Sequence, residues 1–210
     1  MAAKQFNSGF KPSVMDGTEH IFGAGLPTQN LPVSYSYRKF LPDVLNQGES
    51  SICVPCSISA FLNWHENLNS GSKKDNKVDY FEIYNQRTNV GEGMTFKEAF
   101  YYLRHHGVNS KSGKLKIEEY SLIRDINLLK NAIVMNGPCV GALPVYNYGL
   151  EFWNKKNGES LLGYHAIAIV GYNKEGFIIR NSWGRSYGNN GYTLIKYEDL
   201  GKMVEMWTIL

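Results

Sequence analysis

The chain has 210 residues, of which 43% are apolar and 20% charged, enough for one large domain or two small lobes that fold without metals or disulfides. Its net charge of +3 comes from 22 basic and 19 acidic side chains scattered along the sequence, which does not favour a nucleic acid partner. Because it has no long apolar run and no signal-peptide pattern, we expect no membrane contact and an intracellular (cytoplasmic) or assembly-associated protein.

The first elements in chain order are an arm and a helix. Residues 1–30 repeat Gly and Pro without a helical or strand period, which predicts an extended N-terminal arm or short pro-segment lying along the surface. The folded body is expected to cover residues 31–210. Within it, Cys53 opens an amphipathic helix in which apolar residues recur at spacings of three and four, and Pro55 is tolerated in the first turn.

Two more helices and a series of strands follow. Thr95–Glu98 forms a capping box that begins the second helix, and Gly107 ends it; a third is expected over about 125–135. Short β-type runs then cover 140–145, 166–172, 177–181, 192–195 and 204–209. This order predicts an α+β protein with a helical lobe (about 31–135), an antiparallel, barrel-like β lobe (about 136–210) and a cleft between them.

One candidate nucleophile is the cysteine at the start of the first helix. A helix N-terminus offers unpaired N–H groups and a positive dipole end, which favour a thiolate at Cys53. The same N–H groups can bind an oxyanion. Gln47, six residues upstream, could supply the second donor that a tetrahedral intermediate requires.

The partner residues of this nucleophile are expected far downstream. His165 stands near the start of one predicted strand, and Asn181 follows the next, so an antiparallel hairpin would bring the two together. Histidine can accept the thiol proton and return it to a leaving amine, while the Asn amide oxygen orients the ring. Trp183 could shield the Asn–His hydrogen bond from water.

These residues, in this order, resemble the papain family of cysteine peptidases: Gln47-Gly48, Cys53, His165-Ala166, Gly171-Tyr172 and Asn181-Ser182-Trp183-Gly184. The resemblance extends over about 31–210. It implies a papain-like fold and hydrolysis of peptide bonds in a peptide or protein substrate, through a thioester and with no cofactor. It also implies an oxyanion hole made by the Gln side chain and the Cys backbone N–H, with Gly93, Met94 and Tyr164 near the substrate.

The sequence departs from the family pattern at three points. Ser50-Ser51-Ile52 stands where a Cys-Gly-Ser is usual, so the expected disulfide is absent, which fits a reducing compartment. The residues before 31 contain no long propeptide-like helix, so latency must be achieved in another way. The paired substrate-binding glycines are only partly kept, as Gly93-Met94 or Glu92-Gly93.

Two other functions remain open. Cys53-Val54-Pro55-Cys56 is also a Cys-x-x-Cys at a helix N-terminus, which is typical of thiol–disulfide oxidoreductases. A weaker form of this hypothesis is that Cys56 acts only as a resolving thiol, which reacts with Cys53 after Cys53 has been oxidised. Alternatively, the fold could be a structural or peptide-binding component of a larger assembly, with little or no activity. Cys56 and Cys139 are otherwise expected in the core, and the histidines show no metal-ligand spacing, so no metal is predicted.

Overall fold

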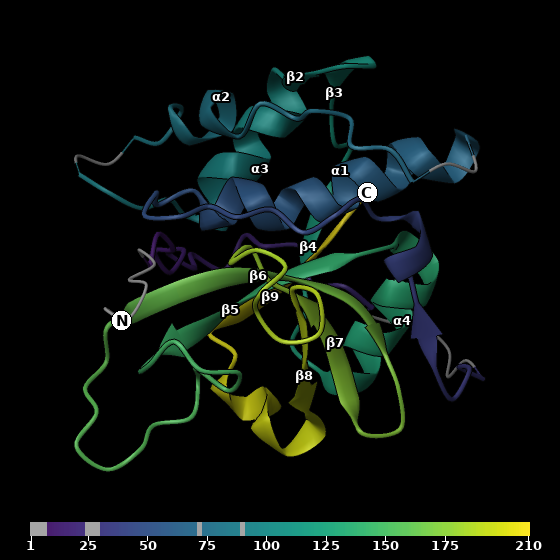
Figure 1. Ribbon diagram of the computed structural model, residues 1–210. Helices are drawn as coiled ribbons and strands as arrows, with labels where there is room; N and C mark the ends of the chain where they lie inside the picture. The colour runs from purple at the N-terminus through teal and green to yellow at the C-terminus, as the bar shows by residue number, and fades with distance from the viewer. Residues whose placement is uncertain (1–7, 24–29, 71–72, 89–90) are drawn as a thin grey trace.

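The computed structural model describes residues 8–23, 30–70, 73–88 and 91–210. A helical half faces a half built on an antiparallel sheet (Figure 1). The helical half contains α1 (Cys53–Ser70), α2 (Tyr80–Tyr84) and α3 (Phe96–His105). This arrangement confirms the predicted α+β class.

The helices form for the local reasons that the sequence indicates. α1 begins at Cys53 as predicted. At the start of α3, the Thr95 side chain accepts a hydrogen bond from the Glu98 N–H, and the Glu98 side chain accepts one from the Thr95 N–H, which completes the predicted capping box. One face of α3 is buried in the core: Phe96, Ala99, Phe100 and Leu103. A small hairpin that was not predicted, β2 (Val108–Ser110) with β3 (Gly113–Leu115), follows this helix.

The sheet half has the strand order β4-β9-β5-β6-β7-β8, and the two-residue strand β1 (Tyr35–Ser36) pairs with β6. Each named pairing is antiparallel. The other strands are β4 (Tyr120–Leu122), β5 (Cys139–Val145), β6 (Gly163–Tyr172), β7 (Gly176–Arg180), β8 (Tyr192–Lys196) and β9 (Glu205–Ile209). Short 3-10 helices lie at Arg38–Phe40 (η1) and Tyr197–Lys202 (η2).

The two halves do not divide at residue 135 as the sequence suggested. β1 and β4 both belong to the sheet, although they lie within the stretch expected to form the helical lobe. α4 (Ile126–Asn136) packs against β9, β6 and β5. The reason is that pairing with distant strands, which a local pattern does not record, decides where a short extended segment belongs.

The centre of the sheet positions two of the predicted site residues. β6 begins at Gly163, three residues before the expected start, so His165 lies within the strand. β6 pairs with β7 in a register that sets Ala168 opposite Arg180, with an irregularity between Ile169 and Gly171. Asn181 follows β7 directly and is thereby held beside His165, as the hairpin prediction required.

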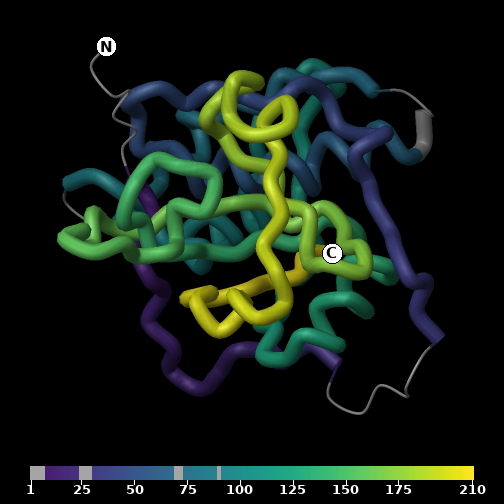
Figure 2. Tube along the Cα trace, turned by 60° about the horizontal axis from the view of Figure 1, so that its bottom comes forward, coloured from purple at the N-terminus to yellow at the C-terminus, as the bar shows by residue number. Residues whose placement is uncertain are grey.

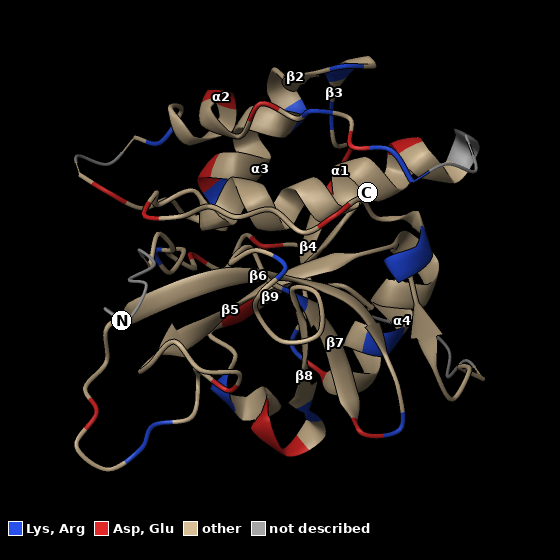
Figure 3. Cartoon of the chain, in the orientation of Figure 1, with Lys and Arg blue, Asp and Glu red and all other residues tan. Residues whose placement is uncertain are grey.

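The N-terminal arm, residues 8–23, lies between the two halves and then continues along the sheet half toward α4 (purple in Figures 1 and 2). Lys and Arg are interspersed with Asp and Glu over both halves (Figure 3). Among the residues that the structure describes, no helix is both long and apolar enough to cross a membrane.

Candidate active site

Cys53 is the first residue of α1, and its side chain is fully buried. Burial raises the pKa of its thiol to about 11, although the backbone N–H groups of Ala166, Gly9, Val54 and Cys53 itself act in the opposite direction. The thiol therefore lies beside the backbone of the residue after His165. In the arrangement seen here it is protonated at neutral pH.

His165 is held in place by one hydrogen bond and two ring contacts within the sheet half. Its Nε2 lies 2.7 Å from Oδ1 of Asn181, and the indole of Trp183 stacks on its ring with centroids 4.7 Å apart. The ring of Phe152 adds an edge contact at 5.7 Å. Burial lowers the pKa of His165 to about 4, against the raising effect of Asn181. Nδ1 has no hydrogen-bond partner within the described part of the chain.

Gln47 connects the two walls of the cleft. Its backbone N–H donates to the carbonyl of Ser182 over 2.8 Å, and its side-chain Oε1 accepts a hydrogen bond from the Ser182 hydroxyl. Its Nε2 donates to the carbonyl of Ser50 over 2.8 Å. These contacts fix the carboxamide on the turn that leads into Cys53, with its oxygen turned toward Ser182.

The arm does not lie on the surface as predicted but passes through the cleft. The Phe10 N–H donates to the carbonyl of Tyr164 over 3.3 Å, on the sheet wall. On the helical wall, the Met94 N–H donates to the carbonyl of Gly9 over 2.9 Å, and the Lys11 N–H donates to the carbonyl of Met94 over 3.0 Å. Residues 9–11 thus bridge Met94 and Tyr164, two positions expected to meet substrate.

Gly9 of the arm lies against Cys53, whose thiol its backbone N–H contacts. A Cβ atom at this position would overlap the backbone of Ser51, in particular its carbonyl oxygen, so only glycine fits. Gly93, the third position expected near substrate, also lies against the arm, because a Cβ there would be 3.2 Å from the carbonyl oxygen of Gly9. Phe10 is only 3% exposed and packs its ring 5.1 Å from that of Phe96.

The rest of the arm is fastened by polar contacts. The Ser13 N–H donates to the Glu205 carboxylate over 2.9 Å, and the Lys97 ammonium lies 2.8 Å from the Glu19 carboxylate. Further along, the Phe22 N–H donates to the carbonyl of Leu122 over 2.9 Å. The arm therefore contacts α3 and the sheet as well as the cleft.

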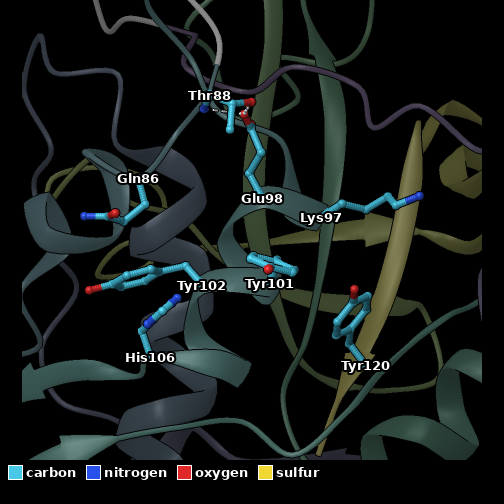
Figure 4. Close-up of a pocket in the computed structure, with 8 residues that line it drawn as sticks. All are labelled: Gln86, Thr88, Lys97, Glu98, Tyr101, Tyr102, His106 and Tyr120. Carbon is cyan, nitrogen blue, oxygen red and sulfur yellow. Dashed lines mark hydrogen bonds between the residues drawn. The ribbon is translucent and has the colours of Figure 1, made fainter.

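A separate cavity of about 400 Å³ lies beside α3 and shares no residue with the predicted catalytic set. Figure 4 shows the rings of Tyr101, Tyr102 and Tyr120 around it, with Thr88 hydrogen-bonded to Glu98 at one end. Lys97, which binds the arm, also lines this cavity. Lys97 of α3 thus contacts both this cavity and the arm.

The three cysteines are free thiols and all are buried. Because Cys53 follows a turn and an isolated bridge at Asn46 rather than a strand, the segment lacks the strand–helix arrangement expected of a thiol–disulfide oxidoreductase. Among the described residues, no group of three or more His, Cys, Asp or Glu side chains could hold a metal ion.

The chain belongs to the papain family of cysteine proteases, because the model of that family matches residues 47–206. Among its relatives, cathepsin K of Mus musculus is 24% identical over an alignment of 196 residues that covers 79% of this chain and 60% of that protein. Procathepsin L of Rattus norvegicus is 26% identical over 188 residues, covering 72% of this chain and 56% of that protein. The chain thus spans less than two thirds of the length of these relatives.

Solved structures show the same fold. Xylellain, a cysteine protease from Xylella fastidiosa, superposes with a TM-score of 0.79 at 21% identity, over 100% of this chain and 98% of that one. Procathepsin B S9 of Trypanosoma congolense gives a TM-score of 0.74 at 15% identity, over 96% of this chain and 86% of that one. At these identities the likeness shows the fold alone.

Proposed function

We propose that the protein is a cysteine peptidase that hydrolyses peptide bonds through a thioester on Cys53. The observation that supports this most is the 2.7 Å hydrogen bond between Nε2 of His165 and Asn181. The residue that follows His165, Ala166, contacts the Cys53 thiol through its backbone N–H. Nδ1 is the ring nitrogen that remains to accept the thiol proton. A base oriented through its other nitrogen is the arrangement that activates a nucleophile.

In this proposal the proton moves twice. Nδ1 of His165 accepts the proton of Cys53 as the sulfur attacks the substrate carbonyl, and then returns it to the leaving amine. Water, deprotonated by the same nitrogen, hydrolyses the thioester. Asn181 keeps the ring in position through both steps, and the stacked indole of Trp183 keeps water away from their hydrogen bond.

Two donors would stabilise the oxyanion of each tetrahedral intermediate. One is the backbone N–H of Cys53, at the N-terminus of α1. The other is the carboxamide nitrogen of Gln47, whose orientation is set by the Ser182 hydroxyl on its oxygen. Met94 and Tyr164 would align the substrate main chain by the backbone groups that now bind the arm.

We further propose that residues 1–30, of which 8–23 and 30 are described, act as a short inhibitory pro-segment. The arm uses backbone groups of Met94 and Tyr164 that a substrate would need, and Gly9 lies against Cys53. Burial in this arrangement keeps both groups neutral, since it raises the pKa of Cys53 and lowers that of His165. Displacing the arm would expose the Cys53 thiol, against which Gly9 lies, to water and favour the thiolate.

The environment of the protein is also a proposal. All three thiols remain unpaired, which supports a reducing compartment such as the cytoplasm, in which structural disulfides are rare.

Labelling with an epoxide inhibitor of cysteine peptidases, followed by peptide mapping, tests the proposed function. We expect the wild-type chain, with or without prior removal of the arm, to be modified at Cys53. We expect Cys53→Ala to lose this label and peptide hydrolysis completely, and His165→Ala to lose both by about 10⁴-fold or more, because residues of a catalytic set act as a unit. If His165→Ala labels as fast as the wild type, the proposed pair does not exist.

A further inference from the structure

Of the two cysteines in the Cys-x-x-Cys of α1, the proposed peptidase reaction uses Cys53 and leaves Cys56 without a role. Cys53 and Cys56 are the first and fourth residues of the helix, both buried and both reduced. Side chains three residues apart on a helix are neighbours, with Cβ atoms about 5–6 Å apart, whereas a disulfide needs about 3.5–4.5 Å. A change of about 1–2 Å in the first turn, where Pro55 has no N–H to lose, is sufficient.

The surroundings of Cys56 are polar on one side. A cavity of about 10 Å³ is lined by Cys56, Arg180 and Asn181 among others, which is close to the smallest space that holds one water molecule. Arg180 is buried, and its guanidinium donates 2.8 Å hydrogen bonds to the carbonyls of Pro42 and Asp43 and to the Tyr192 hydroxyl. Within the described residues it forms no ion pair, so its charge remains available to a nearby anion.

The charges around Cys56 give the two thiols an order of reaction. Burial raises the pKa of the Cys56 thiol, a negative charge on Cys53 raises it further, and Arg180 opposes both. When Cys53 is a thiolate, Cys56 therefore stays protonated. Once Cys53 carries no charge, it no longer raises the pKa of Cys56, while Arg180 still lowers it, so Cys56 loses its proton more readily than before.

We propose that Cys56 is a resolving thiol that converts oxidised Cys53 into a reversible intrahelical disulfide, with a hydroperoxide as the oxidant. The inference rests on the proposed role of Cys53 as a reactive thiolate. The thiolate attacks the peroxide, its O–O bond breaks, and Cys53 becomes a sulfenic acid while the other oxygen leaves as an alcohol or water with the proton that His165 took from the thiol. Cys56 then attacks the Cys53 sulfur, the S–O bond breaks, and the sulfenic oxygen leaves as water with the Cys56 proton.

The result is a peptidase that peroxide switches off without destroying it. The disulfide occupies the nucleophile and removes the sulfenic acid before it can reach the irreversible sulfinic state. A dithiol reductant, itself oxidised to a disulfide, restores both thiols and the activity. Cys139 is fully buried on β5 and has no part in this exchange.

The test compares the wild type, Cys56→Ala and Cys139→Ala, each treated with hydrogen peroxide and then with a dithiol. The set is repeated with Gly9→Ala added to each variant, because the new Cβ would overlap the Ser51 carbonyl and should loosen the cover that the arm gives Cys53. Mass spectrometry of the peptide that spans both cysteines of α1 is read at each stage, together with epoxide labelling of Cys53. We expect the wild type and Cys139→Ala to lose two hydrogens from this peptide and to regain most of their labelling after reduction.

For Cys56→Ala we expect the peptide to gain two or three oxygens, and the labelling to be lost permanently. A wild type that gains oxygens to the same extent, or recovers no better than Cys56→Ala, overturns the proposal. The peptide mass is read independently of labelling. A chain that forms the disulfide but never labels at Cys53 would therefore contradict the peptidase function, and a chain that labels but forms no disulfide contradicts the resolving thiol.

Discussion

The two walls of the cleft hold their reactive residues in different ways. On the sheet wall, His165 is fixed by residues of the same half: Asn181 binds its Nε2, and Trp183 and Phe152 pack around its ring. On the helical wall, the surroundings of Cys53 and Gln47 come partly from elsewhere. The Gly9 N–H reaches Cys53 from the arm, and the Ser182 hydroxyl reaches Gln47 across the cleft.

If the proposed roles hold, this difference separates a fixed base from a nucleophile open to control. The proposed base, His165, is held by packing within the sheet half, so its geometry does not depend on the arm. The proposed nucleophile, Cys53, has surroundings that would change when the arm leaves or when Cys56 reacts. Regulation should therefore act on the helical wall, and changes to the sheet wall should affect the chemical step and the stability of the fold.

Among substitutions that distinguish the two walls, we expect the largest effect, a loss of kcat, from a change at Gln47 on the helical wall. Gln47→Ala removes one of the two proposed oxyanion donors and should lower kcat for a peptide substrate by about 10²–10³-fold, with KM little changed, because the lost interaction would exist only in the transition state. Steady-state kinetics on arm-displaced enzyme measure this.

Ser182→Ala is the matched control for Gln47. It removes the hydroxyl that orients the Gln47 side chain but keeps the backbone bond between Gln47 and Ser182. We expect a smaller loss of kcat than in Gln47→Ala. Equal losses would mean that Ser182 does more than orient the amide, and an unchanged kcat in Gln47→Ala would remove this residue from the oxyanion hole.

On the sheet wall, the buried imidazole should give the fold an acid-sensitive stability. His165 has a folded-state pKa of about 4 and an unfolded one near 6.5, so the unfolded chain binds more protons between these values. The free energy of unfolding should therefore fall as the pH drops from above 6.5 to about 4, by on the order of 3 kcal/mol from this group. Urea unfolding at a series of pH values measures it.

His165→Gln should lack this part of the acid dependence, whereas His20→Gln, which removes an exposed histidine, should keep it. The comparison uses the slope of stability against pH, because His165→Gln also changes the absolute stability. Identical slopes in the wild type and His165→Gln would mean that the ring is not held neutral by burial.

Much of the site could be predicted from sequence because its signals are local. Gln47 and Cys53 stand six residues apart at a helix start, and the Thr95–Glu98 capping box states where α3 begins. His165 and Asn181 are sixteen residues apart on paired strands, so one hairpin was enough to bring them together. The catalytic roles remain predictions, although the structure places these residues side by side.

The path of the arm could not be predicted in the same way. Gly9 and Phe10 meet Met94 and Tyr164 through backbone hydrogen bonds, which any residue except proline can form and which therefore leave no side-chain pattern. The only local signal was a glycine next to a large aromatic residue. The strands β1 and β4, of two and three residues, were missed because they are too short to show a period.

The next prediction concerns how far the arm restricts access to Cys53 on the helical wall. Gly9→Ala adds a Cβ that overlaps the Ser51 carbonyl, and overpacking of this kind costs about 1–3 kcal/mol. The arrangement in which the arm lies over Cys53 should therefore be less stable, and epoxide labelling of Cys53 should accelerate about tenfold or more. Gly201→Ala, where nothing lies within 4 Å of the new Cβ, is the control and should label as the wild type does. Equal rates for both variants would show that the arm does not restrict access.

The smallest effect is expected at the outer fastening of the arm. The Lys97 ammonium binds the Glu19 carboxylate at 2.8 Å, and also contacts Asp16 and the carbonyl of Val14. The Lys97 side chain is 27% exposed, although that of Glu19 is only 2% exposed. Because an ion pair with one solvated partner contributes little, Lys97→Ala should accelerate labelling of Cys53 by about fivefold at most, and the gain should shrink at high salt. Lys196→Ala, which removes an exposed ion pair with Glu198 away from the arm, should change nothing. If Lys97→Ala accelerated labelling as much as Gly9→Ala, the main contact that holds the arm over Cys53 would lie at α3, beside the cavity that Lys97 lines, and not in the cleft.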